Sequence, residues 1–243
     1  MTGTRVDLMR HGETEGGERY RGSTDDVLSP RGWEQMRAAV GEACPWTCII
    51  SSPLKRCAKF AAELAQRHAL PLELDARLQE IHFGAWEGKT AAELLVSHPE
   101  QLARFWNDPL QNPPPGAEPL PHFEARVLAA WNEHLARQAG KQVLIITHGG
   151  PIRMIVGHMQ GLSWLERLGM NVPHASVVSL NGCIEFQGLD IDSPPHFRGG
   201  VDAQRTGWSK DSFTLTATTP PGNCSCVALT SAIHGGRLRG TPP

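Results

Sequence analysis

The chain has 243 residues, of which 40% are hydrophobic and 20% charged, and its formal net charge is −2. This composition is typical of a globular domain, and so small a charge excludes the basic field that draws proteins to nucleic acid. No apolar run approaches the roughly 20 residues that a membrane-spanning helix needs. The first residues lead directly into a strand-like run without a signal-peptide pattern, so we expect a cytoplasmic protein with no nucleic-acid or membrane partner.

The six cysteines and eleven histidines show no metal-binding pattern. No cysteines form a C-x-x-C pair, and no histidines have the H-E-x-x-H spacing. We therefore predict free, buried thiols, no metal and no other cofactor. The histidines interpreted as surface residues are His68, His98 and His134.

Short apolar segments alternate along the chain with segments of helical period. Residues 143–147 contain a continuous Val-Leu-Ile-Ile run, as in a strand that is covered on both faces. Similar runs at 5–9 and 47–51 predict further strands, with weaker candidates at 72–74 and 176–180. This alternation predicts an α/β three-layer sandwich, in which a mostly parallel central sheet has helices on both faces.

Capping signals mark where helices are expected to begin. Ser29-Pro30 and Ser52-Pro53 each place a serine before a proline, which is typical of an N-cap followed by the first helical residue. Thr90, followed three residues later by Glu93, is a capping-box pattern. The spacing of apolar residues predicts helices over 53–68, 123–138 and 151–161.

Two segments depart from this alternation. Residues 87–121 include the run Pro113-Pro114-Pro115-Gly116 and predict a small helical cap inserted over one end of the sheet. Residues 183–243 are rich in Gly, Pro, Ser and Thr, and such a composition buries too little apolar surface to offset the entropy of ordering. We therefore predict one folded domain over 1–182 and a poorly ordered tail over 183–243.

Two motifs place histidine and glycine directly after apolar strands. Arg10-His11-Gly12 follows the first predicted strand, and His148-Gly149-Gly150 follows the strand at 143–147. Because loops at the carboxyl ends of strands form the sites of α/β sheets, we expect both imidazoles at one edge of the sheet. Gly149 would let the backbone approach a ligand closely. Arg56, in the first turn of the second predicted helix, adds a guanidinium that suits phosphate oxygens.

These residue types indicate phosphoryl transfer. A neutral imidazole can attack phosphorus, and nearby arginines both keep it unprotonated and stabilise the charge of the transition state. The leaving alkoxide then needs a proton, for which Glu80 is the candidate donor and Glu87 the alternative. No step of this scheme requires a metal.

Four motifs, in this order, resemble the signature of the histidine phosphatase superfamily, the phosphoglycerate-mutase-like proteins. They are Arg10-His11-Gly12-Glu13-Thr14, the S-S-P-L-x-R run at 51–56, the E-x-x-x-G-x-W-E-G block at 80–88, and Thr147-His148-Gly149-Gly150. The resemblance extends over about residues 5–180.

The resemblance implies a role for each candidate residue. His11 would accept the phosphoryl group, and Glu80 would donate the proton. The family also implies a small phosphorylated substrate. The other implied site residues are Arg10, Arg56 and His148 in the phosphate pocket, and Arg21 and Gly22 in a loop that contacts substrate.

Within the superfamily the chain is most similar to the alpha-ribazole phosphatases of cobalamin biosynthesis, at residues 23–28, 32–36 and 82–88. This resemblance implies alpha-ribazole 5′-phosphate as the substrate. The chain departs from the family pattern at one place that bears on substrate geometry. Many relatives have an asparagine shortly after the first motif, whereas this chain has Glu15-Gly16-Gly17.

Three other functions stay open at this point. A phosphatase of another small phosphoester would have the same motifs. A phosphoglycerate-mutase-type phosphotransferase would have to shield its intermediate from water, for which the predicted cap is short. A non-catalytic phosphate-binding module would not need the complete set of reactive residues that this chain retains. Both a monomer and a homodimer fit the sequence.

Overall fold

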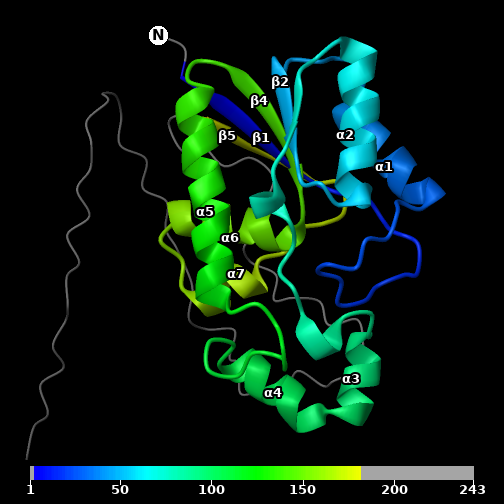
Figure 1. The fold of residues 1–243 in the computed structure, drawn as a ribbon, viewed down its shortest axis with the longest axis vertical. Coiled ribbons are helices and arrows are strands. Elements are labelled where there is room, and N and C mark those ends of the chain that lie inside the picture. The colour runs from blue at the N-terminus through cyan, green and yellow to red at the C-terminus, as the bar shows by residue number, and fades with distance from the viewer. Residues whose placement is uncertain (1–2, 182–243) are drawn as a thin grey trace, which may run out of the picture. The chain divides into compact units, whose positions relative to one another are not determined.

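The computed structural model describes residues 3–181, and the tail predicted over 183–243 lies outside this range. The strands in the described part are β1 (Arg5–Arg10), β2 (Cys48–Ser51), β3 (Leu72–Leu74), β4 (Gln142–Thr147) and β5 (Val177–Asn181). They form one sheet in the order β3-β2-β4-β1-β5, in which only β5 is antiparallel to its neighbour (Figure 1). The prediction of a mostly parallel sheet is confirmed, and each strand lies within about one residue of its expected bounds.

The helices within residues 3–181 lie between the strands and complete the α/β pattern. They are α1 (Pro30–Val40), α2 (Lys55–His68), α3 (Ala91–Ser97), α4 (Pro99–Asn107), α5 (Leu120–Arg137), α6 (Gly149–Met159) and α7 (Trp164–Gly169). Of the predicted helices, 123–138 corresponds to α5 and 151–161 to α6, and both begin earlier than expected. None of the described helices has the length and apolar character that crossing a membrane would require.

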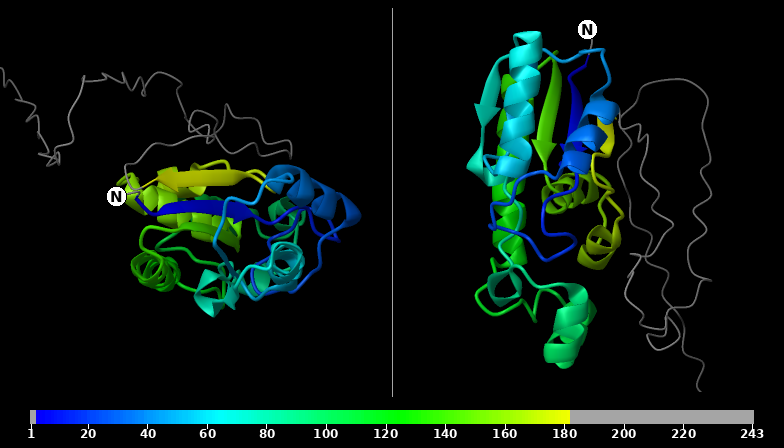
Figure 2. Two further views of the ribbon diagram at one scale, coloured as in Figure 1. Left: turned by 90° about the horizontal axis from the view of Figure 1, so that it is seen from above. Right: turned by 90° about the vertical axis from the view of Figure 1, so that its right-hand side faces the viewer.

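The sheet lies between two layers of helices, as predicted (Figure 2). Ile50 and Ile145 pack into one apolar cluster with residues of α5 and α6. Ile49 and Ile146, which point to the opposite face, pack into a second cluster with residues of α1 and α2. Because successive side chains of a strand alternate between faces, a continuous apolar run such as that of β4 buries both.

Two of the three capping predictions are confirmed. The hydroxyl of Ser29 accepts the N–H of Gly32 at the start of α1, and Thr90 forms a reciprocal capping box with Glu93 at the start of α3. The prediction of a cap at Ser52 was wrong, because α2 begins only at Lys55. The hydroxyl of Ser52 is instead hydrogen-bonded to a buried histidine, as described below.

His134 is buried, so its interpretation as a surface residue was wrong. It lies on the core side of α5, three residues after Trp131, and is 2% exposed. Its Nε2 lies 2.8 Å from Oδ2 of Asp75. Burial raises the pKa of that carboxyl, but hydrogen bonds from Arg77 and His134 outweigh this and lower it to about 2. This hydrogen bond holds α5 against the segment that follows β3.

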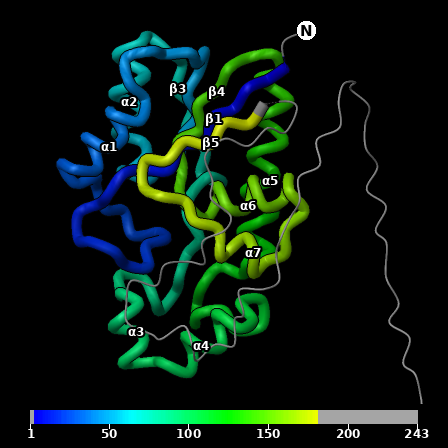
Figure 3. Tube along the Cα trace, turned by 180° about the vertical axis from the view of Figure 1, so that it is seen from behind, coloured from blue at the N-terminus to red at the C-terminus, as the bar shows by residue number. Residues whose placement is uncertain are grey.

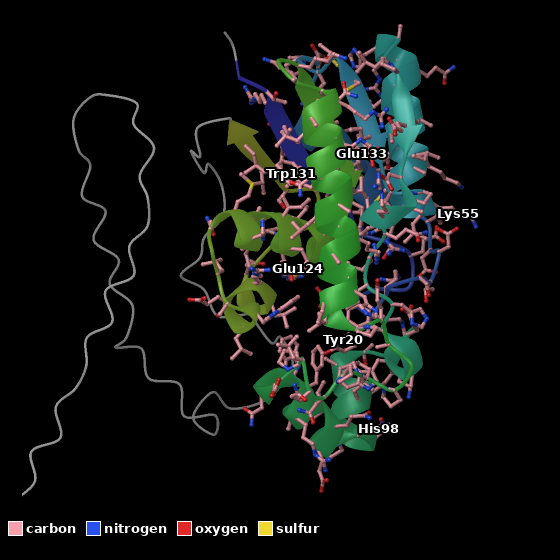
Figure 4. All side chains as sticks on the ribbon, turned by 60° about the vertical axis from the view of Figure 1, so that its left-hand side comes forward. Tyr20, Lys55, His98, Glu124, Trp131 and Glu133 are labelled. Carbon is pink, nitrogen blue, oxygen red and sulfur yellow. The ribbon has the colours of Figure 1, made fainter. Side chains whose placement is uncertain are left out.

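The cap predicted over 87–121 is present as α3 and α4, which lie beyond the carboxyl ends of β1 and β4 (Figures 1 and 2). Tyr20, in the loop after β1, packs on Trp86 with ring centroids 5.2 Å apart and lies beside the cap (Figure 4). The loop after β1 is therefore joined to the cap. The cap has its own buried apolar cluster, formed by Trp86, Leu94, Leu102 and Phe105.

The three cysteines in the described part of the chain are free thiols, as predicted. Cys48 and Cys57 are buried, and Cys44 is partly exposed. Burial raises the pKa of the Cys57 thiol to about 12, which leaves it unreactive at neutral pH. The remaining cysteines lie outside the described residues.

Candidate active site

The two histidines that follow β1 and β4 lie next to each other, as the motifs predict. The two strands are parallel neighbours with Arg10 opposite Thr147, so His11 and His148 leave the sheet at the same edge. Their ring centroids are 5.2 Å apart, and the residues are 6% and 0% exposed. Both rings are therefore positioned by buried strand ends, which hold side chains more rigidly than loops do.

One hydrogen bond determines which nitrogen of His11 is free. Nδ1 lies 2.7 Å from the carbonyl oxygen of Gly12, which can only accept, so Nδ1 carries the proton. Nε2 of the neutral ring then keeps its lone pair. Burial lowers the pKa of His11 well below its ordinary value, and the charges of Arg10 and Arg56 lower it further. The ring is therefore neutral, and nucleophilic at Nε2, at physiological pH.

Arg56 and His148 form a second hydrogen-bonded unit. Nε of Arg56 donates to Nδ1 of His148 at 3.1 Å, so the proton of this ring is on Nε2, which donates to Oγ of Ser52 at 2.8 Å. Burial, and then the charge of Arg56, hold the pKa of His148 well below its ordinary value. The terminal nitrogens of Arg56 donate to the carbonyls of Thr24 (2.6 Å) and Gly22 (2.8 Å). Arg56 thus joins the β1 loop to the end of β4.

One buried N–H group of Arg10 has no hydrogen-bond acceptor among the described residues. Its Nη2 donates to Nε2 of His174 at 3.0 Å, and its Nη1 donates to the carbonyl of Val172. Its Nε is buried and has no hydrogen-bond partner within residues 3–181. A buried donor without an acceptor costs about 1–3 kcal/mol, so this N–H is placed for a ligand with anionic oxygens.

Two residues of this site were missed by sequence reasoning. His174 lies between α7 and β5, on a segment that returns to the end of β1 (Figure 3), and its ring centroid is 5.6 Å from that of His11. Ala175 holds the segment there by donating its N–H to the carbonyl of His11. Arg153, on α6, is the strongest influence after burial on Arg10, whose pKa falls to about 10. Neither residue belongs to a motif that could have revealed it.

Glu80 lies at the N-terminus of α6. Its Oε2 accepts the N–H of Gly150 at 3.0 Å, and its Oε1 accepts the N–H of Ile81 at 3.0 Å. A Cβ on residue 150 would lie 1.9 Å from Oε1, so a side chain there would displace the Glu80 carboxylate. Glu80 lines a cavity of about 70 Å³ whose other walls, including Phe105 of the cap and Phe123 of α5, are mainly apolar.

The carboxylate of Glu87, the alternative proton donor, accepts several hydrogen bonds from the backbone. Its carboxylate accepts N–H groups of Gly22, Thr24 and Phe83 at 2.9–3.2 Å, together with the hydroxyl of Thr24 at 2.7 Å. Burial raises the pKa of this carboxyl, but these hydrogen bonds outweigh burial and lower it. The geometry therefore favours Glu80 over Glu87 as the donor.

Comparison with known proteins identifies the family. A profile of the histidine phosphatase superfamily (branch 1) matches residues 6–185. The chain belongs to the histidine phosphatase superfamily. Among curated relatives, a bifunctional protein of Mycobacterium tuberculosis is 37% identical over 160 residues, which cover 64% of this chain and 44% of that protein. A glucosyl-3-phosphoglycerate phosphatase of Mycolicibacterium vanbaalenii is 33% identical over 194 residues, covering 73% of this chain and 84% of that protein.

Solved structures have the same fold as this histidine phosphatase superfamily member. YhfR of Bacillus stearothermophilus has a TM-score of 0.67 at 29% identity, covering 76% of this chain and 94% of that one. The alpha-ribazole phosphatase of Shigella flexneri has a TM-score of 0.64 at 24% identity, covering 76% and 95%. The predicted resemblance to the superfamily is confirmed, whereas an identity of 24% supports a common fold only.

The loop that contains Arg21 is shaped by two neighbouring glycines. Gly16 and Gly17, which stand where relatives have asparagine nearby, both adopt positive φ (86° and 73°), a conformation that favours glycine. The carbonyls of Glu15 and Gly17 accept hydrogen bonds from Nη2 of Arg21, and Asp26 accepts one from its Nε at 2.6 Å. The substrate contacts implied for Arg21 and Gly22 stay a prediction.

Three histidines in the site of this superfamily member predict a loss of stability in mild acid. His11, His148 and His174 all have lowered pKa values, that of His174 being about 3, so the folded chain binds fewer protons than the unfolded chain below about pH 6.5. The free energy of unfolding should fall by about 1.4 kcal/mol per histidine for each further pH unit. Urea titrations in phosphate-free buffer between pH 7.5 and 5 measure this slope.

Two variants test the origin of that slope. Replacing His174 with asparagine should reduce it, because one titrating group is removed. Replacing the exposed His98 with glutamine should leave it unchanged. A free energy of unfolding that stays constant from pH 7 to pH 5 would contradict the prediction.

Proposed function

We propose that this chain is a phosphomonoesterase that works through a phosphohistidine on His11. The observation that carries the proposal is the hydrogen bond from Nδ1 of His11 to the Gly12 carbonyl, which leaves Nε2 as a lone-pair donor. The unpartnered Nε–H of Arg10 supplies a donor for the phosphoryl oxygens beside it. A neutral nucleophile next to fixed cationic groups is what attack on a phosphate dianion requires.

The reaction would proceed in two balanced steps. Nε2 of His11 forms a bond to phosphorus as the ester P–O bond breaks, and the leaving alkoxide takes a proton from Glu80. Water then attacks the phosphohistidine, Glu80 takes the proton of that water, and His11 returns to its neutral form. Arg10 and Arg56 would stabilise the equatorial oxygens, with His148 holding Arg56 in place. The guanidinium groups supply the positive charge, so the scheme is metal-independent.

Hydrolysis is favoured over transfer to a second hydroxyl. A mutase has to exclude water from its phosphoenzyme, which takes an extended cover over the site. Here the cap consists of α3 and α4, with 7 and 9 residues. We further propose that residues 1–182 form the catalytic domain, in line with the family match over 6–185.

The identity of the ester is a separate question within this proposal. The sequence resemblance predicts alpha-ribazole 5′-phosphate, and that substrate stays a prediction. A relative at 33% identity is a glucosyl-3-phosphoglycerate phosphatase, which makes a phosphorylated carboxylic acid a second candidate.

Phosphate release from a panel of esters tests the proposed activity. The panel contains alpha-ribazole 5′-phosphate, glucosyl-3-phosphoglycerate, 3-phosphoglycerate and p-nitrophenyl phosphate, each with and without EDTA. We expect phosphate release that EDTA does not reduce. Loss of activity with EDTA would contradict the metal-independent route, and phosphate binding without any turnover would instead favour a non-catalytic module. Isomerisation of 3-phosphoglycerate without phosphate release would favour a mutase.

A further inference from the structure

Arg153 presents two donors that nothing else in the described structure uses. Its Nε donates to the carbonyl of Met170 at 2.8 Å, which fixes the orientation of the guanidinium plane. Its terminal nitrogens have no hydrogen bond within residues 3–181. Burial lowers the pKa of Arg153 and the charge of Glu80 partly offsets this, but the two side chains form no ion pair within residues 3–181. Arg153 is therefore a guanidinium that one backbone contact orients, and its terminal nitrogens are open to a ligand.

This guanidinium lies beside the proposed phosphate site. A Cβ on Gly149 would be 3.0 Å from Nη1 of Arg153 and 3.6 Å from Nε of Arg10, so the two guanidinium groups meet over one glycine. Two cations held so close repel each other, and the charge of Arg153 adds to burial in lowering the pKa of Arg10. Such a pair is stabilised by anionic groups, which the transferred phosphate and a second anion on the leaving group can supply.

The surroundings of Arg153 limit what the second anion can be. Arg153 lines the same cavity as Glu80, the proposed proton donor to the leaving group. The cavity is small, about 70 Å³, and its other walls are mainly apolar. A second phosphate would need more donors than one side chain offers, whereas a planar carboxylate is satisfied by two parallel N–H groups of one guanidinium.

We propose that Arg153 binds a carboxylate on the leaving group, so that the preferred substrates are phosphomonoesters of small hydroxy acids. This inference depends on the proposed phosphatase function and specifies its substrate class. It places alpha-ribazole 5′-phosphate, whose leaving group has no carboxylate, among the poor substrates.

Two matched pairs of esters test the proposal. 3-Phosphoglycerate differs from glycerol 3-phosphate, and phosphoserine from phosphoethanolamine, mainly in the carboxylate. We expect kcat/KM to be roughly 10- to 100-fold higher for the carboxylate member of each pair, the range that one charge-assisted bidentate contact supplies. Replacing Arg153 with methionine should remove this preference by lowering kcat/KM for the carboxylate member alone. Arg153→Lys, which keeps the charge but not the guanidinium, should restore part of it.

Arg167 provides the matched control. Like Arg153 it donates its Nε to a backbone carbonyl, that of Leu162, but its Nη1 is paired with Glu124. Arg167→Met should lower the melting temperature without changing the preference for carboxylates. If Arg153→Met slows both members of each pair equally, Arg153 acts on the transferred phosphoryl group, and the proposal is wrong. It is also overturned if the wild-type protein shows no preference.

The assay separates this inference from the proposed function. p-Nitrophenyl phosphate, which has no carboxylate, reports whether phosphoryl transfer occurs at all. Turnover of p-nitrophenyl phosphate without discrimination within the pairs refutes the role of Arg153 alone. Absence of turnover on every ester, together with absence of a phosphoenzyme, refutes the phosphatase function. A melting curve for each variant confirms that the protein is folded.

Discussion

Replacing His11 with alanine should abolish phosphate release and remove the phosphoenzyme. In the proposed mechanism Nε2 of His11 forms the bond to phosphorus, and no other side chain in the site holds an equivalent lone pair. Nε2 of His148 carries a proton that it donates to Ser52, and Nε2 of His174 accepts from Arg10. We expect kcat to fall by at least roughly 10⁴-fold. The phosphoenzyme is measured with a radiolabelled ester as acid-labile, alkali-stable label on the protein.

A control separates loss of the nucleophile from loss of the fold. His98 is exposed on the cap, so His98→Ala should keep both activity and label. Because His11 is buried, its alanine variant leaves a cavity, and its retained fold has to be checked by circular dichroism. Full phosphoenzyme formation by folded His11→Ala would assign the covalent step to another residue and end the proposal.

The pairing of the two histidines could be predicted because it depends on local patterns. A continuous apolar run identifies a buried strand, and in a parallel sheet the residue after each strand emerges at the same edge. For His11 and His148 to lie side by side, β1 and β4 also had to be neighbours in the sheet. The family motifs supplied that condition, and the register of the sheet fulfils it.

Other features could not be predicted because they depend on contacts between distant segments. The pattern Ser52-Pro53 is a sound capping signal, but the hydroxyl forms a hydrogen bond with His148, 96 residues away, and the helix begins later. His134 falls on the buried side of a helix whose orientation is set by the core. Asp75, which compensates its burial, is 59 residues distant.

The division of roles among charged residues likewise needed coordinates. From sequence, Glu80 is the candidate donor and Glu87 the alternative, and their hydrogen-bond partners distinguish the two carboxylates further. Arg153 gives no signal of its own, since an arginine on a helix is most often a surface residue. Its significance arises from the position of its guanidinium next to Arg10 and from terminal nitrogens that no residue within 3–181 accepts a hydrogen bond from.

Replacing Glu80 with glutamine should slow phosphoryl transfer in proportion to how poor the leaving group is. An alkyl alkoxide needs a proton as the P–O bond breaks, whereas p-nitrophenolate is stable without one. A positioned general acid contributes roughly 10²–10⁴-fold, so we expect a loss of this size for glycerol 3-phosphate and a loss below about tenfold for p-nitrophenyl phosphate. Single-turnover formation of the phosphoenzyme is the correct measurement, because the second step also uses Glu80.

Glu87→Gln is the matched control for this experiment, since it makes the same chemical change on the other candidate. Its carboxylate holds the loop around Gly22 and Thr24, so the variant should lose stability and slow both esters by the same factor. Glu80→Gln also loses one backbone acceptor, because an amide offers a single oxygen to the N–H groups of Ile81 and Gly150. That structural effect acts on both esters equally and therefore cancels in their ratio. A ratio that Glu80→Gln leaves unchanged, or that Glu87→Gln alters, would place the proton on a group other than Glu80.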